Sequence, residues 1–283
     1  MKPRRILSVA RLSFPLATAL AALFNLAAPS AFAANQNWTG GGANANWSTA
    51  LNWNGAAPGA TSGTTNTDVA TFNAAIANTW GLTGSPILID SAAQNIGGLS
   101  FTTAADNYFV GTTAGNSLKL TSAGTIQILA GLTTTNAVET VNAPLVIQLA
   151  NGTYTFANNS ANGTGAGAGT LNFAGGITGG AAGATVLTLS GSNTNANTIS
   201  GVIGNGTATT LAITKSGAGT WVLGNANTYT GSTVLNGGTL KYTANNTGIK
   251  ALNFGVLTSS GTGTNMSAAR PPAPLMPKQP RVT

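Results

Sequence analysis

One five-residue pattern constrains the fold of this chain more than any other feature: Gly-Thr, an apolar residue, any residue, and a second apolar residue. Alternate residues of a β-strand point to opposite faces, so the two apolar positions are expected to face a core, while Thr and the fourth residue face outward. Repetition of one short strand is typical of stacked β-architectures. The pattern begins at Gly124, Gly152, Gly169, Gly219 and Gly238.

The most regular part of the chain runs from Leu211 to Tyr242, where short apolar segments alternate with turns of Gly, Asn, Ser and Thr. Its recurring residues are Lys215, Gly217, Gly219, Thr220, Leu223, Asn227, Thr228, Tyr229, Thr230, Gly231, Thr233, Gly238, Thr239 and Leu240. In these residues the stretch resembles the autotransporter-associated β-strand repeat of passenger-domain proteins, although Trp221 stands where the family pattern has Leu. The resemblance implies a right-handed parallel β-helix in a secreted or surface-displayed bacterial protein, and it implies no catalytic residues.

Two all-β architectures fit the rest of the sequence. Helical periodicity is missing from the mature chain, and imperfect repeats favour a β-solenoid. An antiparallel β-sandwich stays open as the alternative, because four Asn-Gly pairs would suit two-residue hairpin turns. These pairs begin at Asn151, Asn162, Asn205 and Asn236. Further strands are predicted at Ile87–Asp90, Leu99–Thr102, Leu118–Thr121, Leu145–Leu149 and Val186–Leu189.

Residues 1–33 are predicted to be a signal peptide. A basic start precedes an apolar stretch that is interrupted by Ser, Pro, Thr and Asn, which argues against a membrane anchor. Small residues at Ala31 and Ala33 form a cleavage site, so the export machinery is expected to cut between Ala33 and Ala34.

Three regions are expected after the signal peptide. Residues 34–80 form a Trp-rich N-terminal cap segment, and residues 81–264 form the β-strand-repeat solenoid. Residues 265–283 are rich in Pro and are expected to be a disordered tail. The abrupt change into this tail predicts a truncated or frameshifted gene product, since the family usually continues into more repeats.

Charge and composition exclude several classes of protein. The chain has 11 basic and 4 acidic residues, but the body from Asn35 to Thr264 carries four of each sign. A neutral body lacks the basic stripe that nucleic-acid binding needs, so no nucleic-acid partner is expected. The chain has no Cys, so packing and backbone hydrogen bonds must stabilise it without disulfides.

The tryptophans offer one candidate binding site. The first interpretation of Trp38, Trp47 and Trp53 is that they cover the open first rung, because a solenoid needs an atypical terminal cap. The alternative is that these three indoles, together with Trp80, stack on a glycan or a host-surface ligand. We favour the cap.

Catalytic chemistry has little support. Without His or Cys, the common nucleophile triads and the thiolate or imidazole metal sites are excluded. Asp68, Asp90 and Asp106 could provide paired carboxylates for a polysaccharide-degrading enzyme, or a Ca²⁺ site. Each lies in a turn-like context that favours a capping role, so no catalytic residue, metal or cofactor is expected.

The sequence therefore predicts an exported structural β-helical passenger segment, secreted or displayed at the cell surface. A carbohydrate-binding adhesin is the alternative, and a polysaccharide-degrading enzyme comes after it. The C-terminal rungs, around Val234–Tyr242 and Leu252–Leu257, carry little charge. We expect this edge to associate with the edge of another copy.

Overall fold

The computed structural model describes residues 35–244 and 252–254. The predicted signal peptide with its Ala33–Ala34 cleavage site, and the predicted disordered tail at 265–283, lie outside the described residues.

The described residues form β-strands joined by turns, with one short 3-10 helix, η1 (Ala50–Asn52). The strands are β1 (Gln36–Asn37), β2 (Val69–Phe72), β3 (Asn95–Phe101), β4 (Phe109–Val110), β5 (Leu118–Ile128), β6 (Ala137–Val141), β7 (Leu145–Ile147), β8 (Thr153–Asn158), β9 (Gly169–Phe173), β10 (Ile177–Gly179), β11 (Ala184–Gly191), β12 (Ala196–Ile199), β13 (Ile203–Gly206), β14 (Thr210–Lys215), β15 (Thr220–Leu223), β16 (Thr233–Leu235), β17 (Thr239–Tyr242) and β18 (Leu252–Phe254).

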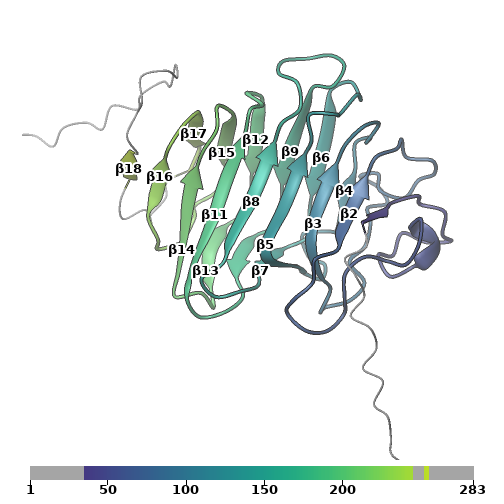
Figure 1. Ribbon diagram of the computed structural model, residues 1–283, viewed down its shortest axis with the longest axis horizontal. Helices are drawn as coiled ribbons and strands as arrows, with labels where there is room; N and C mark the ends of the chain where they lie inside the picture. The colour runs from purple at the N-terminus through teal and green to yellow at the C-terminus, as the bar shows by residue number, and fades with distance from the viewer. Residues whose placement is uncertain (1–34, 245–251, 255–283) are drawn as a thin grey trace, which may run out of the picture. The chain divides into compact units, whose positions relative to one another are not determined.

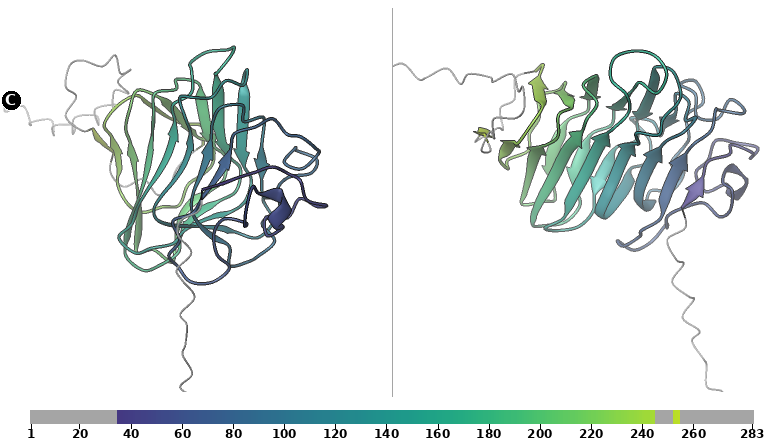
Figure 2. Two further views of the ribbon diagram at one scale, coloured as in Figure 1. Left: turned by 45° about the vertical axis from the view of Figure 1, so that its right-hand side comes forward. Right: turned by 45° about the horizontal axis from the view of Figure 1, so that its top comes forward.

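These strands build two stacked sheets. The larger follows the order β1-β2-β3-β5-β8-β11-β14-β16-β18, with β7, β10 and β13 as a side branch, and the smaller follows β17-β15-β12-β9-β6-β4. Figure 1 shows the strands of the larger sheet side by side, and Figure 2 shows the smaller sheet running along it. From β3 onward the chain alternates between the two sheets, as in β8, β9, β11 and β12, so each later turn of the chain adds a strand to both.

Each pair of neighbouring strands in these two sheets is parallel. The prediction of a parallel β-solenoid is therefore confirmed. The alternative of an antiparallel β-sandwich is wrong. Three of the Asn-Gly pairs that suggested hairpins lie in turns between parallel rungs, and the fourth, Asn205-Gly206, forms the end of strand β13.

The inward positions of the five-residue pattern are also confirmed. Both apolar residues are buried in four copies, and in the last copy Leu240 is buried while Tyr242 is half-buried. The outward prediction fails for Thr220, whose side chain is only 8% exposed on β15. The predicted strand at Ile87–Asp90 is likewise wrong, because this segment makes only isolated bridges, at Ile87 and Leu88.

The core consists of side chains stacked in register from rung to rung. Across the core, the rings of Phe156 on β8 and Phe173 on β9 stack with their centroids 4.3 Å apart. Apolar side chains stacked on successive rungs exclude water from the space between them, which is how a solenoid buries apolar surface. One inward column of the larger sheet contains Leu99, Ile126, Phe156, Leu189, Lys215 and Leu235.

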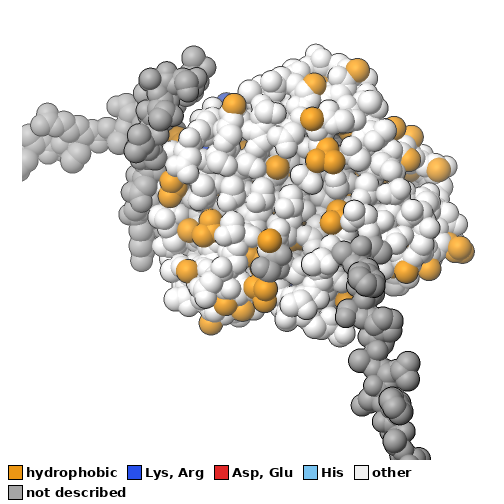
Figure 3. Space-filling model, viewed as in Figure 1, with side chains coloured by type: hydrophobic (Ala, Val, Ile, Leu, Met, Phe, Trp, Pro, Cys, Tyr) orange, Lys and Arg blue, Asp and Glu red, His pale blue; other side chains and the backbone are white. Residues whose placement is uncertain are grey.

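The outward face of the larger sheet carries mostly uncharged side chains, and Lys119 on β5 is an exception. One column places four threonines in register on successive rungs. In Figure 3 the visible face shows scattered apolar side chains and very little charge. The four threonines are Thr125, Thr155, Thr188 and Thr214.

Candidate functional site

The tryptophans of the N-terminal segment lie inside the fold. The ring centroids of Trp53 are 5.0 Å from Trp38 and 4.8 Å from Trp47, and Trp38 and Trp53 both pack on Phe72 of β2. The indole of Trp47 is fully buried, and its Nε1 donates a hydrogen bond of 2.8 Å to the Pro58 carbonyl. These three indoles cover the core at β2, close to where the larger sheet begins, and present no free ring face to a sugar.

Trp80 differs from the other three. Its indole is half-buried, and Nε1 donates a hydrogen bond of 3.1 Å to the Gly42 carbonyl. Among the four indoles proposed for glycan stacking, this is the one that keeps substantial exposed surface.

The three aspartates hold separate turns. Buried Asp68 accepts a hydrogen bond of 2.8 Å from the Gly59 amide, and exposed Asp90 accepts one of 3.0 Å from the Ser48 amide. Asp106 accepts one of 2.9 Å from the amide of the next residue. Each carboxylate thus binds a backbone amide. The bond of Asp106 is local, as the capping interpretation expects, whereas those of Asp68 and Asp90 reach amides 9 and 42 residues away in the chain.

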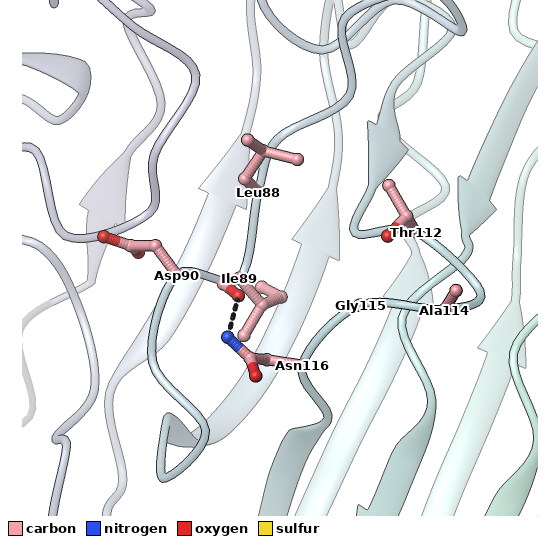
Figure 4. Close-up of a pocket in the computed structure, with 7 residues that line it drawn as sticks. All are labelled: Leu88, Ile89, Asp90, Thr112, Ala114, Gly115 and Asn116. Carbon is pink, nitrogen blue, oxygen red and sulfur yellow. Dashed lines mark hydrogen bonds between the residues drawn. The ribbon is translucent and has the colours of Figure 1, made fainter.

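A surface cavity of about 340 Å³ lies beside Asp90. Figure 4 shows the Asp90 carboxylate pointing away from Thr112 and Asn116, while the Asn116 amide donates a hydrogen bond of 2.9 Å to the Ile89 carbonyl. The cavity therefore places a single carboxylate at its rim and gathers no second acidic group. Within residues 35–244, no three acidic, His or Cys side chains come together in a way that could hold a metal ion.

Among the described residues, two acidic or basic side chains are fully buried inside the solenoid, and their burial was not predicted from the sequence. Glu139 on β6 is fully buried, and its Oε2 accepts a hydrogen bond of 3.1 Å from the Tyr108 amide, while Oε1 has no hydrogen-bond partner. Burial raises the pKa of Glu139 well above its ordinary value of 4.5; the Tyr108 amide opposes this rise, and the nearby Asp106 carboxylate adds to it. With no exposed surface, this carboxyl group cannot reach a polysaccharide chain.

We expect the Glu139→Gln variant to lose a pH dependence that the native chain shows. A carboxyl group whose pKa is raised by folding stabilises the fold below its unfolded pKa, and this stability is lost as pH rises toward the folded pKa. The native free energy of unfolding should therefore fall above about pH 4.5, while that of the variant stays flat. Urea unfolding at a series of pH values measures both; the absence of His and Cys keeps other titrations few between pH 5 and 8. Parallel profiles for the two proteins would contradict the assignment.

Lys215 is the second of these fully buried side chains, at the end of β14. Its Nζ donates hydrogen bonds to three backbone carbonyls: 2.6 Å to Ser216, 2.9 Å to Gly217 and 3.1 Å to Gly237. Gly217 and Gly237 belong to successive turns of the solenoid, so one ammonium ties two rungs together. Burial lowers the pKa of Lys215 to about 8, and the three carbonyl oxygens favour the charged form.

The turn that receives Lys215 requires glycine at one position. Gly238 has a φ of +66°, and a Cβ there would lie 2.7 Å from the Lys215 Nζ. A side chain at Gly238 would both strain the backbone and displace the ammonium.

A signal for both buried charges is present in the sequence. Lys215 has the same parity as Leu211 and Ile213 on its strand, and Glu139 has the same parity as Ala137 and Val141 on its own. Strict alternation predicts that they point inward, although charged residues are seldom buried without partners.

The described part of the chain is thus a parallel β-solenoid whose rungs are tied by buried polar side chains. Residues 213–241 match the family model described as passenger-associated-transport-repeat, so the predicted autotransporter passenger repeat is confirmed for this stretch. The repeat supports an autotransporter-passenger-like protein, and its family implies a secreted or surface-exposed one. Searches of curated proteins and of solved structures give no match. Within the described ranges, no helix has the length and apolarity needed to cross a membrane.

Proposed function

We propose that this chain is an exported structural segment of an autotransporter-like passenger, which extends a stalk and performs no chemistry of its own. The observation that carries the proposal is the position of the matched repeat. Residues 213–241 run from β14 through β15 and β16 into β17, so they supply strands to both sheets. The repeat is part of the solenoid itself and is stacked on the preceding rungs.

The contacts between rungs support a structural role. Lys215 joins successive turns inside the matched repeat. Asn197 ties this repeat to the rungs before it, since its Oδ1 accepts from the Leu171 amide at 2.9 Å and its Nδ2 donates to the Thr220 carbonyl at 3.0 Å. Each of these side chains satisfies backbone groups of neighbouring turns, which stiffens the stack without providing a ligand site.

Export and glycan binding can be tested with the full chain. Expressed in a Gram-negative host, it is expected outside the inner membrane with Ala34 as the first residue, because residues 1–33 have the form of a signal peptide. The purified protein is expected to show no saturable change in tryptophan fluorescence with a panel of glycans. Cytoplasmic protein that retains residues 1–33 would contradict the export proposal.

A carbohydrate-binding adhesin remains the second candidate, and the half-exposed indole of Trp80 favours it. A saturable fluorescence change that is lost in Trp80→Ala would support this adhesin over the purely structural segment. The same change retained in Trp80→Ala would place the ligand elsewhere and would also contradict the structural proposal.

A further inference from the structure

The five Asn-Gly pairs of this chain are chemically alike but structurally different. In an Asn-Gly pair the glycine amide nitrogen can attack the Asn side-chain carbonyl carbon, because glycine has no Cβ to hinder the approach. A five-membered succinimide forms as ammonia leaves, and water then opens the ring to Asp or to isoaspartate. The reaction requires the Asn side chain to rotate freely and the following amide nitrogen to be unoccupied.

We propose that Asn236 is a site of spontaneous deamidation in the folded protein, and that the fold protects the other four Asn-Gly pairs. The proposal depends only on the hydrogen bonds around each pair and is independent of the proposed function.

Asn205 and Asn151 are held through their side chains. The Asn205 Oδ1 accepts hydrogen bonds of 3.0 Å from the amides of Leu211 and Thr230, and its Nδ2 donates one of 2.7 Å to the Thr230 Oγ1. The Asn151 Oδ1 accepts one of 3.1 Å from the Ala184 amide. Ring closure at either residue must first break contacts between rungs.

Asn54 is also held through its side chain. Its Oδ1 accepts a hydrogen bond of 2.8 Å from the Asn37 amide, so ring closure there must first break this contact.

Asn162 lies on an exposed turn but is held on both sides of the reacting bond. Its Oδ1 accepts a hydrogen bond of 2.7 Å from the Thr194 amide. The attacking nitrogen, the amide of Gly163, donates a hydrogen bond of 2.9 Å to the Asn195 Oδ1. Exposure alone therefore does not make this pair reactive.

Asn236 lacks both restraints. It follows β16, its side chain is exposed, and among the described residues this side chain makes no hydrogen bond. Its backbone amide donates a hydrogen bond of 2.8 Å to the Lys215 carbonyl, which fixes the main chain and leaves the side chain free to rotate. In the same described part of the chain, the Gly237 amide donates no hydrogen bond.

Conversion at Asn236 would act on the contact between rungs that Lys215 makes. The Gly237 carbonyl accepts a hydrogen bond of 3.1 Å from the Lys215 Nζ. Isoaspartate adds one methylene group to the main chain immediately before Gly237. This insertion would move the carbonyl away from the ammonium and loosen the stack at this repeat.

Peptide mapping by mass spectrometry tests the proposal, with all five pairs in one sample. The full chain is incubated at mildly alkaline pH, folded or in urea. In the folded protein, Asn236 should convert about tenfold faster than Asn205 or more, since about 1.4 kcal/mol of local opening free energy accounts for each factor of ten. In urea the five rates should converge, because only the dipeptide then matters. Equal rates in the folded protein, or conversion of Asn205 or Asn162 before Asn236, would overturn the proposal.

Two variants separate the chemistry from its consequence. Gly237→Ala should slow conversion and keep the fold, because Gly237 does not have positive φ and an added Cβ would lie 3.3 Å from the Gly217 carbonyl oxygen, a distance that a small shift relieves. Asn236→Gln changes only an exposed side chain and provides the same test if the alanine variant fails to fold. Conversion as fast as in the native chain in both variants would also overturn the proposal.

Discussion

Leu223→Asp is expected to unfold the rungs around β15, with a loss in the free energy of unfolding of about 4 kcal/mol or more. Leu223 is fully buried, and its in-register neighbours are Ile199 on β12 and Tyr242 on β17. The substitution removes apolar contacts and places a carboxylate where those neighbours offer no basic partner. A loss of this size is a large part of the stability of an ordinary domain.

The adjacent residue provides the matched control. Val222 is half-buried on the outward side of β15 and stands in register with Lys241. Val222→Asp makes the same chemical change beside a cation, so its cost should stay within about 1 kcal/mol. Guanidinium unfolding followed by circular dichroism compares the two variants. Similar losses for both would show that the inward and outward faces of β15 have been assigned wrongly.

Lys215→Met is expected to lower the free energy of unfolding by about 2 kcal/mol. Methionine keeps most of the apolar stem but donates no hydrogen bond, so the carbonyls of Ser216, Gly217 and Gly237 lose their shared donor. The loss in the free energy of unfolding is reduced, because the substitution also removes the buried ammonium and the cost of its desolvation.

Lys241→Met is the matched control, because Lys241 is an exposed lysine of the same repeat. Its change in stability should stay within about 0.5 kcal/mol. Thermal unfolding of both variants at neutral pH gives the comparison. Loss of stability in Lys241→Met equal to that in Lys215→Met would mean that net charge, and not the contact between rungs, stabilises the fold.

A pH series sharpens the same experiment. The pKa of Lys215 is lowered from 10.5 to about 8, so between these values the unfolded chain holds a proton that the folded chain has released. The stability contributed through this group therefore rises with pH across that window. The native protein should gain stability relative to Lys215→Met from pH 8 to pH 10.5, and an unchanged difference would contradict the lowered pKa.

The sequence by itself determined the local features of this protein. Alternation of apolar and polar residues predicts which side chains face inward, because neighbouring residues of any strand point to opposite faces. That rule predicts that Tyr154, Phe156, Trp221 and Leu223 lie in the core, as they do, without any knowledge of which strands pair. The family repeat was recognisable for the same reason, since its residues are close together in the chain.

Tertiary structure alone decided which strands became neighbours. The five-residue pattern at Gly152 joins the larger sheet and the one at Gly169 joins the smaller, although the two sequences are alike. Which strands pair depends on where the chain re-enters a sheet after each turn. The turns differ in length, and the five-residue pattern does not indicate the length of the turn that follows it. The burial of Trp38, Trp47 and Trp53 was decided in the same way, by their packing against one another and against Phe72.

The same reason explains the polar groups inside the solenoid. Lys215 is tolerated there because a carbonyl from the next turn completes its hydrogen bonds, and Glu139 is held by an amide from another rung. The difference between Asn236 and Asn205 likewise comes from neighbours that are distant in the chain. The sequence by itself determined which side of a strand each residue occupies, whereas the stacking of rungs decided which group it meets there.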